Sequence, residues 1–211
     1  MSIAKSCIAT ALCICLTIGN STAGPQSQEM RIDRASSTMT VNVGRSGLFG
    51  FAGHDHEVIA PVLEGSVMLD RTDFSRSKLS IEFDATAMKV TGKGEPAKDV
   101  PEVQRVMLSE RVLDVQRHPK ITFVSESISV AQHSPNRAQL RINGRLTLHG
   151  VTHPVTVPTQ VELSANRLTA TGKATVKQTD FGIRPVNAGG GTVKVKDEVE
   201  LVFTIVASPA S

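Results

Sequence analysis

The feature that most limits how this chain folds is a regular alternation of apolar and polar residues. In residues 140–148 every second residue is apolar apart from Gly144, and the residues between them are polar. The same period of two recurs in residues 39–43, 67–69, 79–83, 121–123, 155–163, 168–176 and 199–205. Successive side chains of a β-strand point to opposite faces, so this period predicts strands with one buried face. We therefore expect an all-β protein of about eight strands.

The segments between these strands are mostly short and contain residues that favour turns. They include residues 70–73 (Asp-Arg-Thr-Asp), 134–136 (Ser-Pro-Asn) and 165–166 (Ala-Asn). Short connections predict antiparallel neighbours, because parallel strands need a crossover of a dozen or more residues. A two-sheet sandwich and a closed barrel both satisfy this pattern.

One helix interrupts the strands. Val103, Val106, Met107 and Glu110 follow helical spacing after Pro101, and the segment ends before the His-Pro pair at residues 118–119. Proline is tolerated in the first turn of a helix and disfavours helix in the residue before it. The pattern therefore predicts a short helix between two strands.

The N-terminal segment has the pattern of a secretory signal peptide. Lys5 precedes an apolar run over residues 7–18, and residues 21–23 (Ser-Thr-Ala) supply the small residues of a cleavage site. The run is shorter than the ~20 apolar residues that a membrane-spanning helix needs. The alternative, a buried helix of the fold, is weaker because the run has neither a cap nor a polar face. All three cysteines lie in this segment, so the mature chain would contain no disulfide and no thiolate ligand or nucleophile.

We therefore expect a signal peptide over residues 1–23 and export to the periplasm. A polar lead-in follows over residues 24–30, then a single domain over residues 31–207 and a short tail over residues 208–211. The net charge is +3, and the chain has seven Phe but no Trp or Tyr. Proteins that hold single-stranded nucleic acid combine a basic groove with stacking aromatic rings, so nucleic acid is not an expected partner.

Four motifs lie on this strand pattern in a recognisable order. They are residues 118–123 (HPKITF), 146–156 (LTLHGVTHPVT), 179–183 (TDFGI) and 193–199 (VKVKDEV). Together they resemble the YceI family of periplasmic lipid- or polyisoprenoid-binding proteins. The resemblance implies an eight-stranded antiparallel, lipocalin-like barrel with one short helix at an end. It also implies a non-enzymatic binding or carrier function, with an isoprenoid, quinone or fatty-acyl chain in the lumen. It leaves the oligomeric state open, a dimer included.

Closing the barrel would turn the apolar face of every strand inward. The candidate ligand-binding residues of the lumen are then Leu79, Ile81, Phe83, Ile121, Phe123, Leu140, Ile142, Leu146, Leu148, Ala170, Ala174 and Phe181. An eight-stranded barrel is either filled by side chains or just wide enough for a slender ligand. The small residues Ala170, Gly172 and Ala174 favour an open lumen. The alternative is a filled barrel that serves as a scaffold, for example in a stress response.

The histidines offer the one further constellation with metal chemistry. His54 and His56 flank Asp55 and would share one face of an extended strand, where both imidazoles can meet one metal ion. His149 and His153 bracket a turn and are further candidate ligands. A metal-dependent enzyme built on these residues is the second alternative. We favour a structural role for the histidines, with Gly150 supplying the backbone freedom of a hairpin turn, and expect no cofactor.

Overall fold

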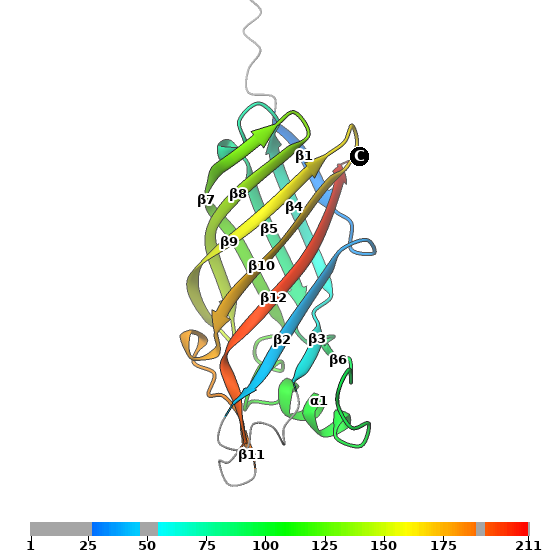
Figure 1. Ribbon diagram of the computed structural model, residues 1–211, viewed down its shortest axis with the longest axis vertical. Coiled ribbons are helices and arrows are strands. Elements are labelled where there is room, and N and C mark those ends of the chain that lie inside the picture. The colour runs from blue at the N-terminus through cyan, green and yellow to red at the C-terminus, as the bar shows by residue number, and fades with distance from the viewer. Residues whose placement is uncertain (1–26, 47–54, 189–192, 211) are drawn as a thin grey trace, which may run out of the picture.

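The computed structural model describes residues 27–46, 55–188 and 193–210, and long antiparallel strands make up most of them (Figure 1). The strands are β1 (Ser27–Ile32), β2 (Thr38–Ser46), β3 (His56–Ile59), β4 (Val62–Asp70), β5 (Lys78–Asp84), β6 (Lys89–Val90), β7 (Lys120–Ser134), β8 (Arg137–Leu148), β9 (Val151–Leu163), β10 (Leu168–Lys177), β11 (Asn187–Ala188) and β12 (Val193–Pro209). Between them lie one α-helix, α1 (Val100–Leu108), and the short 3₁₀ helices η2 (Phe74–Arg76) and η3 (Gln178–Phe181).

Eight of the described strands close into an antiparallel barrel. The hydrogen-bonded order is β1-β4-β5-β7-β8-β9-β10-β12, and β12 pairs again with β1. This confirms the expected eight-stranded barrel with one short helix, and it excludes the sandwich. The closing contact joins Met30 on β1 to Pro209 on β12. Because every strand in this circuit has two neighbours, the alternating apolar residues share one enclosed interior.

At the lower end of the barrel in Figure 1 the wall continues through shorter strands. β2 pairs with the same edge of β12 as β1 does, further toward the start of β12. β3 pairs with β2, and β6 pairs with β3. Three positions in the barrel wall are therefore each occupied by two successive strands with a break between them. These are β1 and β2, β3 and β4, and β5 and β6.

The barrel begins and ends outside the limits expected for the domain. β1 starts at Ser27, within the expected polar lead-in, and β12 runs to Pro209, within the expected tail. Met30 is fully buried and Ile32 is 4% exposed. Two buried residues in a short polar segment are too few to reveal a strand by periodicity. Pairing with both β4 and β12 is what makes this segment a strand.

The hairpin between β8 and β9 has the geometry that its sequence predicts. Leu148 pairs with Val151, so the loop consists of His149 and Gly150 alone. Both have positive φ, 53° and 74°, as a type I′ turn requires. A Cβ atom on Gly150 would lie 2.5 Å from the ring of His118. Glycine is therefore required at position 150 both by the turn conformation and by the close approach of the His118 ring.

The helix α1 covers the lower end of the barrel (Figure 1). It begins at Val100 with Pro101 in its first turn, as expected, but ends at Leu108, short of Glu110. Its partly buried residues Val103 and Met107 pack against the core. Gln104 joins the helix to β6: its Nε2 donates to the carbonyl oxygen of Met88 (2.9 Å), and its Oε1 accepts from the N–H of Val90 (2.8 Å). One amide side chain thus completes the hydrogen bonds of a strand edge.

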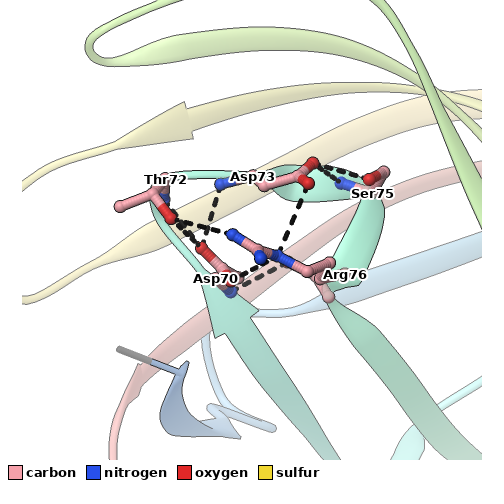
Figure 2. A network of polar contacts seen from close by, with 6 residues as sticks. Asp70, Thr72, Asp73, Ser75 and Arg76 are labelled. Carbon is pink, nitrogen blue, oxygen red and sulfur yellow. Dashed lines mark hydrogen bonds and ion pairs between the residues drawn. The ribbon is translucent and has the colours of Figure 1, made fainter. Parts of the chain in front are cut away.

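The connection between β4 and β5 is organised by the buried carboxylate of Asp70 (Figure 2). Its Oδ1 accepts from the Thr72 hydroxyl (2.6 Å) and from the N–H groups of Thr72 and Asp73 (2.9 Å each). Its Oδ2 lies 3.0 Å from Nε of Arg76. These bonds hold η2 so that Phe74, which is 3% exposed, enters the end of the barrel opposite α1.

This network predicts a pH dependence of stability. The hydrogen bond from Thr72, with the two backbone N–H groups and Arg76, holds the pKa of Asp70 below its ordinary value of 3.8. The stabilising contribution is complete above pH 3.8 and is lost as the pH falls through the lower pKa of the folded protein. We expect Asp70→Asn to lower the melting temperature at pH 7 by a few degrees and to flatten its decline in acid. Thermal unfolding at pH 7 and pH 3, with the exposed Asp180→Asn as control, tests this. If the melting temperature falls by the same amount from pH 7 to pH 3 in wild type and Asp70→Asn, the prediction is wrong.

Candidate functional site: the barrel lumen

A cavity of about 240 Å³ lies in the interior of the barrel. Residues from the far ends of the barrel line it, from Phe74 on η2 to Met107 on α1. Eleven of the residues expected in the lumen lie on its wall: Leu79, Ile81, Phe83, Ile121, Phe123, Leu140, Ile142, Leu146, Leu148, Ala170 and Ala174. Their contact with a ligand remains a prediction.

Phe181, the twelfth expected residue, is not part of this wall. It is fully buried at the end of η3, and its ring lies edge-on to that of His153, with centroids 5.9 Å apart. The alternation of β10 ends at Lys177, where the chain turns into η3. The period of two ends with the strand, so it gives no information on the direction of the Phe181 side chain. Its ring belongs to the buried hydrophobic core but not to the residues that line the cavity.

The polar groups that border the cavity are already engaged by the protein. The Ser77 hydroxyl accepts from the N–H of Asp70 (3.0 Å), and the Thr159 hydroxyl donates to the carbonyl of Val157 (3.2 Å). Nε2 of Gln178 donates to the carbonyl of Lys196 (2.7 Å). Of the other residues that line the cavity, all are apolar except Lys78. A space of this kind favours an apolar occupant over water.

The small residues of β10 do not all open the lumen. A Cβ atom on Gly172 would lie 2.6 Å from the ring of Phe203 on β12 and would overlap the carbonyl of Pro158. The expected space at Gly172 is therefore filled by the Phe203 ring. Ala170 and Ala174, on either side of it, line the cavity.

Residues outside the strands complete the site, and sequence reasoning missed them. Phe74 closes one end, while Met88, Met107, Val112 and Leu113 contribute at the other. These residues lie in turns and in the helix segment, where a period of two gives no signal. Their apolar character was visible, but only the folded chain shows that they face the lumen.

The barrel wall is incomplete between β9 and β10. β9 pairs with β10 only through residues 159–163, although it pairs with β8 along its full length. Pro154 and Pro158 lie in the part of β9 that does not pair with β10. Proline has no N–H to donate, so within sheets it is confined to positions where no neighbouring strand needs that hydrogen bond. A surface crevice occupies this seam, and Val155 and Val176 border both the crevice and the central cavity.

The histidines do not assemble a metal site in the part of the chain that the structure describes. His54 lies outside the described residues. Asp55 accepts from the N–H of Arg45 (3.1 Å). His149 places Nδ1 3.2 Å from the carbonyl oxygen of Phe181. Residues 27–46, 55–188 and 193–210 contain no group of three or more His, Cys, Asp or Glu side chains placed to hold a metal ion. The same ranges contain no helix long and apolar enough to cross a membrane.

Comparison with known proteins agrees with this architecture. A polyisoprenoid binding domain from Saccharophagus degradans superposes with a TM-score of 0.61 at 12% identity, covering 86% of this chain and 98% of that one. BcnA from Burkholderia cenocepacia gives 0.60 at 21% identity, covering 84% and 99%. At these identities the two structures establish a shared fold.

Sequence comparison carries the assignment further. A UPF0312 protein of Pseudomonas syringae pv. tomato is 28% identical over 146 residues, which are 66% of this chain and 68% of that protein. The YceI-like domain matches residues 30–207, nearly the whole described barrel. The order of the motifs, the closed eight-stranded wall and this match agree, and the chain belongs to the YceI family.

Proposed function

We propose that this protein is a non-enzymatic binding or carrier protein that holds an apolar chain in the barrel lumen. The class of chain we propose is isoprenoid, quinone or fatty-acyl. The observation that carries the proposal is the central cavity, whose wall is apolar and whose few polar groups are bonded within the protein. The polyisoprenoid binding domain of Saccharophagus degradans, which has the same fold, supports it.

The energetics of such a complex are favourable. Burying apolar surface contributes ~25 cal/mol per Å², so roughly 300 Å² of hydrocarbon contributes about 7.5 kcal/mol before the costs of association. The wall needs no large rearrangement to accept a slender chain, because its apolar side chains already face the cavity. A preformed apolar site also limits the ordering cost of binding.

The test is to purify the exported protein without detergent, extract it with organic solvent and identify the lipid by mass spectrometry. We expect an apolar chain in near-stoichiometric amount. Protein that never carries lipid, and takes up none from vesicles, would favour the filled scaffold instead. Stoichiometric metal that disappears when His54 and His56 are both replaced by Ala would favour the metal-dependent enzyme.

We further propose that the protein acts in the periplasm after removal of residues 1–23. Lys5, the apolar run and the small residues before Gly24 support this proposal. The mature protein is expected to begin at Gly24 and to contain no titratable thiol. Intact mass measurement of exported protein tests both expectations. A mature chain that retains Cys7 would overturn the proposed export.

A further inference from the structure

A buried acid and an imidazole face each other at the end of the barrel that α1 covers. His56 opens β3, and Glu95 lies between β6 and α1. Nδ1 of His56 and Oε1 of Glu95 are 3.1 Å apart. The Glu95 side chain is only 1% exposed and that of His56 is 21% exposed. The pair is thus largely withdrawn from solvent.

The register of the strands places this pair on the lumen side of the wall. Val58, two residues along β3 from His56 and on the same face, lines the cavity. Val43, the partner of His56 across β2, lines it as well. His56 therefore continues the lumen-facing side of β3 beyond Val58. β3, β6 and α1 lie together at this end in Figure 1.

The pair is incompletely bonded. Within the described ranges, neither Nδ1 of His56 nor either carboxylate oxygen of Glu95 makes a hydrogen bond of acceptable geometry. A buried charged acceptor without a donor is costly, so such groups in native proteins call for an explanation. The neighbouring Glu57 differs: it accepts from Lys93 (3.0 Å) and Thr91 (3.2 Å). Among the described residues, Glu95 faces only Nδ1 of His56, at 3.1 Å, and its second carboxylate oxygen has no donor.

We propose that Glu95 and His56 bind the polar head of the lumen ligand, and that this head is a hydroxyl group. The inference rests on the proposed function. A carboxylate only accepts hydrogen bonds, whereas a hydroxyl both donates and accepts. One ligand hydroxyl donates to one carboxylate oxygen of Glu95 and accepts from the His56 ring, which gives each side chain one partner. A phosphate or carboxylate head would instead bring a second negative charge against a buried acid. The site thus selects a long-chain alcohol over the corresponding phosphate.

Binding of two matched probes to the delipidated full-length mature protein tests this. The probes are geranylgeraniol and geranylgeranyl phosphate, each measured by displacement of a fluorescent long-chain alcohol analogue from the lumen. We expect the alcohol to bind at least tenfold more tightly than the phosphate. Glu95→Gln should reduce that preference to threefold or less, because the amide offers donors to the phosphate. Glu57→Gln, a neutralised carboxylate with partners of its own, is the matched control and should keep the full preference.

The outcomes separate this inference from the proposed function. Wild type that binds both probes equally overturns the head-group site but leaves the lumen as the binding site. If wild type and Glu95→Gln both prefer the alcohol to the same extent, the selectivity comes from other residues. That outcome also overturns the head-group site. No binding of either probe overturns the proposed function itself. Glu95→Ala provides a second variant if Glu95→Gln does not fold; it also removes the carboxylate, with the same expected loss of preference.

Discussion

Replacing Ala174 by Phe is expected to empty the barrel of its ligand. Ala174 is 7% exposed, lies opposite Leu201 of β12 and lines the cavity from β10. A benzyl group in its place enters a lumen of about 240 Å³ and occupies the path of the chain. Overpacking of this kind costs ~1–3 kcal/mol of stability, which a closed barrel can tolerate. Native mass spectrometry of the purified variant should show less than a tenth of the lipid load of wild type.

The matched control for this experiment is a change on the outer face. Arg145 on β8 has a side chain that is 49% exposed and lies 3.9 Å from Glu126, so Arg145→Ala should leave the lipid load unchanged. Circular dichroism reports the fold, because the chain has no Trp or Tyr for fluorescence. If Ala174→Phe folds and keeps its full load, the ligand does not occupy this part of the lumen.

The largest loss of stability is expected from Phe181→Ala. Phe181 is fully buried, and truncating a buried Phe typically costs ~3–5 kcal/mol through lost burial and the cavity left behind. Its carbonyl oxygen lies 3.2 Å from Nδ1 of His149, and its ring lies edge-on to the ring of His153. The ring thus ties η3 to the start of β9, beside the seam. Urea unfolding followed by circular dichroism measures the change.

The same variant separates packing from ligand contact. Because Phe181 is absent from the lining of the lumen, the folded Phe181→Ala protein should keep its lipid load at low temperature. Phe181→Leu is the control and should recover most of the stability, since it retains most of the buried volume. If a Phe181 variant loses its lipid while remaining as stable as wild type, Phe181 contacts the ligand and this prediction is wrong.

The alternation in residues 140–148 and 168–176 was enough to predict two walls of the barrel and the inward direction of their apolar side chains. That prediction holds because the period of a strand is local: Leu140 and Leu148 share a face whatever their partners are. The β8–β9 hairpin was predictable for the same reason, since the turn chemistry of His149 and Gly150 acts within four residues. For the lumen, the sequence therefore identified the wall residues of the strands.

Other parts of the site depend on residues that are distant in the chain. β1 is a strand because β4 and β12 pair with it, and Phe181 leaves the lumen because η3 packs on β9. Glu95 meets His56 only because the segment before α1 folds back over β3. By itself the sequence determined most of the long strands, their apolar faces and the family to which they are similar. The closure of the wall, the seam beside β10 and the buried pair at one end were decided by tertiary contacts, since long-range pairing and burial have no local period to reveal them.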